Sequence, residues 1–282
     1  MGTIINGREK AKETREEIKN FVADRIKASK RVPSLATVLI GEDGGSISYM
    51  NNQTKLCNEL GLIPKNIKLK EDVLESEVIK LIHQLNEDYS IDGIIIQLPL
   101  PKHLNEKNIT SAISHKKDVD CLTDINMGKL YKGEQSFIPC TPQSILHLIK
   151  STGINISGKN AVIIGRSNIV GKPTAQLLLN ENATVTVCHS KTVNLKEICS
   201  NADILVAAIG RPGFVTREFI KEGSVIIDVG TSMVEGKIAG DVNFEEAMEK
   251  AAFVTPVPGG VGAMTTTMLM KNTCEAMMRN AY

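Results

Sequence analysis

Short apolar runs rich in β-branched residues alternate along the chain with longer segments of helical periodicity, and this alternation is what most restricts the fold. The run at residues 91–97, Ile-Asp-Gly-Ile-Ile-Ile-Gln, is almost continuously apolar, which is typical of a strand buried on both faces. Strands that alternate with helices predict a parallel sheet covered by helices, so the fold class is α/β. The other predicted segments of this half are a helix at 8–28, a strand at 34–41, a helix at 46–60, a strand at 66–70 and a helix at 74–87.

The second half of the chain repeats the alternation and predicts a second α/β domain. A length of 282 residues corresponds to about two domains. We expect a first domain over residues 1–140, joined by a C-terminal helix over 265–282 that crosses back onto it, and a second domain over 141–264. The predicted elements of this half are a helix at 142–151, strands at 161–164, 184–188, 204–208, 224–229 and 253–254, and a last helix at 265–278.

Composition excludes several classes of function. With 33 Lys plus Arg against 32 Asp plus Glu, and only 4% aromatic residues, the chain has neither a basic field nor stacking platforms for nucleic acid. No apolar run approaches the ~18 residues of a membrane span, and the first residues lack the pattern of a signal peptide, so we expect a cytoplasmic protein. The six cysteines form no C-x-x-C pair, which favours neither a metal site nor a disulfide framework.

The segment from Gly165 to Gly171 is a candidate phosphate-binding turn. Gly165 ends the apolar run at 161–164, and a helix is expected to begin after Gly171. Such a turn aims backbone N–H groups at an anion, which suits the pyrophosphate of a dinucleotide. Because Ser167 stands where the usual G-x-G-x-x-G motif has its second glycine, an ordinary strand–turn–helix is the alternative.

The next predicted strand favours NADP over NAD as the dinucleotide. It ends at Cys188 and is followed by His189 and Ser190, where an NAD site usually carries an acid for the ribose hydroxyls. No acid is present there. The hydroxyl of Ser190 and the guanidinium of Arg166 would instead accommodate a 2′-phosphate.

Six sequence blocks in order along the chain strongly resemble the methylenetetrahydrofolate dehydrogenase/cyclohydrolase family. They are residues 92–101, 118–120, 139–142, 165–171, 188–192 and 255–262. The resemblance covers nearly the whole chain. It implies two α/β domains flanking a folate cleft, the second a Rossmann-type NADP-binding domain, and a homodimer formed through that domain. The implied activity is the NADP-dependent oxidation of 5,10-methylenetetrahydrofolate by hydride transfer. Without the resemblance, the substrate class of an NADP-dependent oxidoreductase stays open and includes malate- and shikimate-type acids.

The resemblance also implies the site residues, and no metal among them. Those around the folate substrate are Tyr49, Gln97, Asp120, Pro258 and Gly262. Those around NADP are Thr141, Gly165, Arg166, Ser167, Ile169, Ser190, Thr231 and Thr265.

Elementary chemistry supports two of the folate residues. The Asp120 carboxylate can accept hydrogen bonds from both the ring N–H and the exocyclic amine of a pterin, and the Tyr49 ring can stack on a planar ligand. A solvated loop acid and a half-buried helix aromatic are the respective alternatives.

The chain departs from the family at one catalytic position. The family carries Tyr-x-x-x-Lys, whose lysine serves proton transfer in hydrolysis, but the fourth residue after Tyr49 is Gln53. Lys55 is the sixth, about 240° round a helix from Tyr49 and on another face. Hydride transfer leaves a resonance-stabilised cation and needs no protein base, whereas hydrolysis needs a group that titrates.

Tyr49, Gln53, Gln97 and Asp120 are therefore the catalytic candidates of a dehydrogenase whose cyclohydrolase activity is expected to be lost or weak. A bifunctional dehydrogenase/cyclohydrolase is the alternative. A non-catalytic folate- or dinucleotide-binding module is the alternative from another class.

Overall fold

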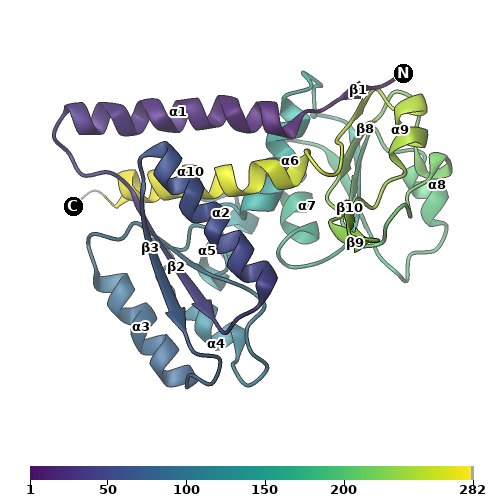
Figure 1. Ribbon diagram of the computed structural model, residues 1–282. Coiled ribbons are helices and arrows are strands. Elements are labelled where there is room, and N and C mark those ends of the chain that lie inside the picture. The colour runs from purple at the N-terminus through teal and green to yellow at the C-terminus, as the bar shows by residue number, and fades with distance from the viewer. Residues whose placement is uncertain (281–282) are drawn as a thin grey trace. The chain divides into compact units, whose positions relative to one another are not determined.

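The computed structural model describes residues 1–280, which divide into two compact units (Figure 1). Unit 1 comprises Met1–Lys12 and Pro139–Thr265, and unit 2 comprises Glu13–Ile138 and the chain from Thr266 onward. Helices α1 (Gly7–Lys27) and α10 (Val261–Arg279) each begin in unit 1 and end in unit 2. The last two residues of the C-terminal segment predicted over 265–282 lie outside the described residues.

Unit 1 is built on a six-stranded sheet in the order β1-β11-β8-β7-β5-β6, and all neighbouring strands are parallel. The order reverses at β5, which lies between β6 and β7. In open parallel sheets a ligand binds at such a switch point, beyond the carboxyl ends of the strands. The strands are β1 (Thr3–Ile4), β5 (Asn160–Ile164), β6 (Thr184–Cys188), β7 (Ile204–Ala207), β8 (Val225–Asp228) and β11 (Phe253–Val254).

Short helices and one antiparallel hairpin complete unit 1. The helices are α6 (Cys140–Lys150), α7 (Gly171–Asn180), α8 (Leu195–Cys199), α9 (Phe244–Lys250) and the 3-10 turn η1 (Arg217–Phe219). The hairpin consists of β9 (Ser232–Val234) and β10 (Lys237–Ala239). Side chains such as Leu205 and Ile226 on the central strands are fully buried, as expected for strands covered on both faces.

The predicted division of the chain differs from the observed one at its start. The sequence predicts residues 1–140 in one domain, but Met1–Lys12 belongs to unit 1. The physical reason is backbone pairing: Thr3 and Ile4 form a parallel edge strand against Phe253 and Val254 of β11. A two-residue strand has too little periodicity to be recognised in the sequence.

Unit 2 contains a three-stranded parallel sheet, β3-β2-β4, with β2 at its centre. All seven residues of β2 (Ser34–Ile40) are buried, whereas β3 (Ile63–Leu69) has exposed residues, as an edge strand should. The apolar run predicted as a buried strand forms β4 (Gly93–Ile96), and its side chains are buried as expected. The helices are α2 (Gly44–Leu60), α3 (Glu75–Glu87), α4 (Glu106–Ser111) and α5 (Asp124–Lys132).

Local hydrogen bonds determine where the helix of the candidate site begins and ends. The Asp43 carboxylate accepts a hydrogen bond from the backbone N–H of Ser46 (2.8 Å) and caps α2, which therefore begins two residues before the predicted start. Gly61 ends the helix with a left-handed φ of 78°. Of the described helices, none is long and apolar enough to cross a bilayer.

A buried carboxylate at the end of β8 organises the loops that follow it. The Asp228 carboxylate accepts backbone hydrogen bonds from Gly230, Asp241 and Val242, each 2.9 Å long. Loss of water around this buried group raises the pKa of Asp228 to about 6, although the three N–H donors act in the opposite direction. The neighbouring Asp241 charge also raises this pKa.

This raised pKa makes the stability of the fold depend on pH in a defined direction. Asp228 titrates at about 6 in the folded chain but near the ordinary 3.8 when unfolded. Its protonation therefore stabilises the fold at low pH, and this contribution is lost as the pH rises through 6. Between pH 7 and pH 4.5 we expect the unfolding free energy of the wild type to gain about 2 kcal/mol relative to Asp228→Asn. Urea denaturation of both chains at several pH values measures this difference. A difference that does not change with pH contradicts the prediction.

Candidate cofactor and substrate sites

The turn between β5 and α7 requires glycine at both ends. Gly165 has a φ of +129°, which side-chain-bearing residues avoid, and a Cβ there would overlap the carbonyl oxygen of Ala208. A Cβ on Gly171 would overlap the carbonyl oxygen of Gly165. The hydroxyl oxygen of Ser167 accepts hydrogen bonds from the backbone N–H groups of Val170 (3.2 Å) and Gly171 (3.3 Å). Ser167 thus closes the turn from within.

A cavity of about 330 Å³ lies beside this turn, at the carboxyl ends of β5, β6 and β7. Its basic side chains are Arg166, His189 and Arg211, and no acidic side chain lines it. Ser190 adds a hydroxyl group. The remaining lining is apolar or glycine: Ile164, Gly165, Leu195, Ala208, Ile209 and Phe214. Cationic groups beside an apolar wall suit a phosphate-bearing nucleotide.

The structure brings some of the predicted cofactor residues into this cavity and leaves others outside. Gly165, Arg166 and Ser190 line it. Ser167 and Ile169 belong to the adjoining turn, where the Ile169 side chain is exposed. The three predicted threonines lie elsewhere in unit 1, outside the cavity lining: Thr141, Thr231 and Thr265. The role of each residue toward the cofactor remains a prediction.

Sequence reasoning missed Arg211 and Phe214 as members of this cavity. They follow β7, which pairs with β5 along Ile164 and Ala207. The sequence shows a basic residue soon after the predicted strand 204–208. This residue can be assigned to the cofactor cavity only when β7 is known to lie next to β5.

In unit 2, two of the predicted catalytic side chains are in contact. Gln53 on α2 is 1% exposed and Gln97, directly after β4, is 4% exposed. Gln97 Nε2 donates a hydrogen bond to Gln53 Oε1 (3.0 Å), and Thr37 Oγ1 lies 3.5 Å from the same oxygen. Among the described residues, the buried Gln53 Nε2 has no hydrogen-bond partner. A buried donor without a partner costs stability unless a ligand or water accepts from it.

The helix places the nearest lysine away from this pair, as the sequence indicates. Lys55 is 78% exposed and its Nζ lies 4.0 Å from the Glu59 carboxylate on the same helix. Tyr49, one turn before Gln53, is half-buried. Lys55 therefore does not take the place of the missing lysine within unit 2.

The two acids of the run at residues 118–120 have different environments. Asp118 is fully buried, and its carboxylate accepts hydrogen bonds from Leu122 N (2.8 Å), Thr123 N (2.9 Å) and Asn126 Nδ2 (2.9 Å). It holds the turn that precedes α5. Asp120 is only half-buried, so it is the acid of this run with access to a ligand.

The remaining predicted substrate residues belong to unit 1. Pro258 and Gly262 lie in and directly after the loop between β11 and α10. This loop is packed closely against the start of α1, because a Cβ on Gly7 would overlap the carbonyl oxygen of Gly260. The predicted folate residues are thus divided between the two units, and the cleft that would unite them remains a prediction.

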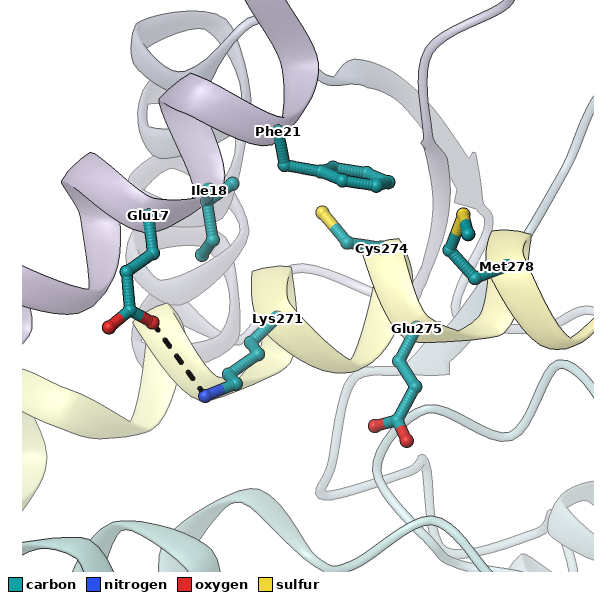
Figure 2. A pocket seen from close by; sticks show the side chains of 7 residues that line it. All are labelled: Glu17, Ile18, Phe21, Lys271, Cys274, Glu275 and Met278. Carbon is teal, nitrogen blue, oxygen red and sulfur yellow. Dashed lines mark ion pairs between the residues drawn. The ribbon is translucent and has the colours of Figure 1, made fainter. Parts of the chain in front are cut away.

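A separate cavity of about 360 Å³ lies in unit 2 between α1 and α10 (Figure 2). Phe21 of α1 lies opposite Cys274 and Met278 of α10, while Lys271 and Glu17 form an ion pair (3.9 Å) at its edge. None of the predicted site residues lines it. Within residues 1–280, no group of three or more His, Cys, Asp or Glu side chains could hold a metal ion.

The fold and the cofactor cavity define a two-unit α/β protein whose unit 1 is a Rossmann-type nucleotide-binding unit. Two family profiles match the chain. The tetrahydrofolate dehydrogenase/cyclohydrolase NAD(P)-binding domain matches residues 139–281, and the catalytic domain of the same family matches residues 5–120. The chain belongs to the tetrahydrofolate dehydrogenase/cyclohydrolase family.

Individual relatives from this family match the chain over nearly their whole length. The bifunctional protein FolD of Clostridium botulinum is 61% identical over 277 residues, covering 98% of each chain, and that of Clostridium acetobutylicum is 60% identical, covering 98% of this chain and 100% of the relative. The crystal structure of the bifunctional FolD dehydrogenase/cyclohydrolase from Campylobacter jejuni superposes with a TM-score of 0.96 at 40% identity, covering 99% of both chains. A Trypanosoma brucei structure, complexed with NADP and an inhibitor, has a TM-score of 0.94 at 37% identity, covering 99% of this chain and 98% of that one.

The close approach at Gly165 generates a stability prediction. Gly165→Ala introduces a Cβ against backbone atoms at a strained φ, so we expect a loss of about 2–4 kcal/mol of unfolding free energy. Gly158→Ala is the matched control, because Gly158 also has a positive φ (77°) but a Cβ there would meet no atom within 4 Å. It should cost about 1 kcal/mol. Chemical denaturation measures both. Equal losses would show that the contact with Ala208 is unimportant.

Proposed function

We propose that the protein oxidises 5,10-methylenetetrahydrofolate to 5,10-methenyltetrahydrofolate with NADP, and that it also hydrolyses the methenyl product, but slowly. Membership of the family supports the folate substrate. The observation that supports NADP as the cofactor is the lining of the cavity at the switch point of the sheet. Arg166 and Ser190 belong to this lining, and no acidic side chain does. A carboxylate there would repel the 2′-phosphate of NADP, whereas a guanidinium attracts it.

In the oxidation, the protein binds and orients rather than exchanging protons. NADP, when bound, supplies the nicotinamide that accepts the hydride. We assign stacking on the folate ring to Tyr49 and pterin binding to the half-buried Asp120 carboxylate. The cation left by hydride removal is stabilised by the adjacent nitrogen, so no base is required and Gln53 does not obstruct the step.

Hydrolysis is supported by the relatives and limited by Gln53. The sequence predicts a cyclohydrolase activity that is lost or weak, and the relatives at about 60% identity, which are named bifunctional, favour an activity that is retained. An amide does not titrate near neutral pH and cannot move the proton of an attacking water. The Gln53 Nε2 donor can still hold a water or a substrate oxygen, because it is buried with no partner among the described residues. Positioning without proton transfer predicts slow hydrolysis.

A homodimer formed through the NADP-binding unit is a further part of the proposal and rests on the resemblance alone. Sedimentation of the purified chain measures it. The cytoplasmic location expected from the sequence is also part of the proposal.

Assaying the two reactions separately, with a lysine restored, tests this function. The wild type should form NADPH from methylenetetrahydrofolate at a normal family rate and hydrolyse methenyltetrahydrofolate slowly. Gln53→Lys should raise hydrolysis about a hundredfold, within the range that general acid–base groups contribute. Asn52→Lys is the matched control, because Asn52 is exposed on the same helix and should change neither reaction.

Three outcomes of these assays would contradict the proposal. If the folded wild type forms no NADPH, the proposed dehydrogenase activity is wrong. If no hydrolysis is detected, the proposed slow cyclohydrolase activity is wrong and the protein has the dehydrogenase activity alone. An unchanged rate in Gln53→Lys, with oxidation retained, shows that Gln53 does not limit hydrolysis.

The cofactor preference rests on Arg166. Arg166→Ala should raise the KM for NADP ten- to a hundredfold, about the effect of losing a charge-assisted hydrogen bond, and change the KM for NAD little. Lys172→Ala is the control, since Lys172 bonds to Asn168 Oδ1 (2.8 Å) and does not line the cavity. Steady-state kinetics with both dinucleotides measure the ratio. Equal losses would mean that Arg166 supports the turn rather than recognising phosphate.

A further inference from the structure

Two guanidinium groups line the same side of unit 1 without a compensating acid. Arg166 follows β5 and Arg211 follows β7, and both line the cofactor cavity. In residues 1–280, neither forms an ion pair with a carboxylate, and His189 adds a third basic side chain to the lining. Like charges gathered at one cavity repel each other, and a multiply charged anion bound between them would relieve that repulsion.

The backbone of Arg211 is held in place by a buried carboxylate. Asp241 is 0% exposed and accepts hydrogen bonds from three successive N–H groups, those of Ile209 (2.7 Å), Gly210 (3.1 Å) and Arg211 (2.6 Å). Asp228 in turn accepts the backbone N–H of Asp241. The loop that carries Arg211 is therefore ordered before any ligand binds, which lowers the entropic cost of binding.

The side chain of Arg211 is also positioned. Its guanidinium carbon lies 4.5 Å from the ring centroid of Phe214, within the range of a cation–π contact. The Phe214 ring lies 5.3 Å from that of Phe219, which is buried in the core of unit 1. A chain of ring contacts thus connects the guanidinium to the core, and its N–H donors remain available to a ligand in the cavity.

We propose that Arg211 is a specificity-determining residue that binds the 2′-phosphate of NADP together with Arg166 and Ser190. The inference rests on the proposed NADP function and extends it. The three side chains follow β7, β5 and β6, which are neighbours in the sheet, so their donors converge on one place at its carboxyl edge. A phosphate monoester is close to a dianion at neutral pH and offers three acceptor oxygens, which matches two guanidinium groups and one hydroxyl.

Calorimetric titration of the full chain with two cofactor fragments tests the proposal without catalysis. The probes are 2′,5′-ADP, which carries the 2′-phosphate, and 5′-AMP, which does not. We expect the wild type to bind 2′,5′-ADP more tightly. Arg211→Gln should weaken the binding of 2′,5′-ADP at least about tenfold and that of 5′-AMP less than about twofold. Arg211→Lys, which keeps the charge but not the planar fork, should recover part of the loss.

A matched arginine close by in the chain supplies the control. Arg217 is 61% exposed, forms an ion pair with Glu249 (2.8 Å) and does not line the cavity. Arg217→Gln should leave both affinities unchanged. Thermal unfolding of each variant establishes that differences in affinity do not arise from loss of the fold.

The outcomes separate this inference from the proposed function. An equal loss of affinity for both fragments in Arg211→Gln would show that Arg211 contacts the adenosine 5′-phosphate that the two fragments share, and would overturn the proposal. Unchanged binding of 2′,5′-ADP in that variant would overturn it as well, while the wild-type preference for this fragment would leave the NADP assignment intact. A wild type that does not prefer 2′,5′-ADP over 5′-AMP would overturn both.

Discussion

Parallel pairing of β5 with β6 on one side and β7 on the other is the interaction on which the cofactor cavity depends. The pairing aligns Ile164 with Cys188 and with Ala207, so the segments that follow all three strands emerge at the same edge. At this edge the backbone segments that follow β5 and β7 approach each other so closely that Gly165 has no space for a Cβ beside Ala208. Backbone proximity, rather than any single side chain, therefore forms the cavity in which basic groups gather.

Buried carboxylates then order the edge that the sheet creates. Asp241 binds the three N–H groups of residues 209–211, and Asp228 binds the N–H of Asp241 itself. Both acids are almost completely buried, and neither lines the cavity. They satisfy backbone donors that would otherwise be buried without partners, and leave the cationic side chains to interact with a ligand. Burial of the Asp228 carboxylate away from water is the main cause of its raised pKa, and the nearby Asp241 charge raises this pKa further.

The predicted catalytic residues of unit 2 differ from the cationic lining of the cofactor cavity, because Gln53 and Gln97 are both neutral. Gln53 and Gln97 share a hydrogen bond in the interior of unit 2, so an amide is held at the position where the resemblance implies a lysine. In the proposed function, oxidation does not depend on a titratable group at position 53, whereas hydrolysis does.

The sequence by itself determined the α/β class, most strands and long helices, and the different helix faces of Tyr49 and Lys55, because these follow from local periodicity. It also indicated the family through blocks of residues that keep their order. Only the tertiary structure placed β1 against β11, joined Gln53 to Gln97, and assigned Asp118 to the turn while leaving Asp120 accessible. Arg211 is the clearest case: 45 positions separate it from Arg166, and only the strand order β7-β5-β6 brings them to one cavity. Such non-local pairings depend on packing between distant segments, which no local pattern records.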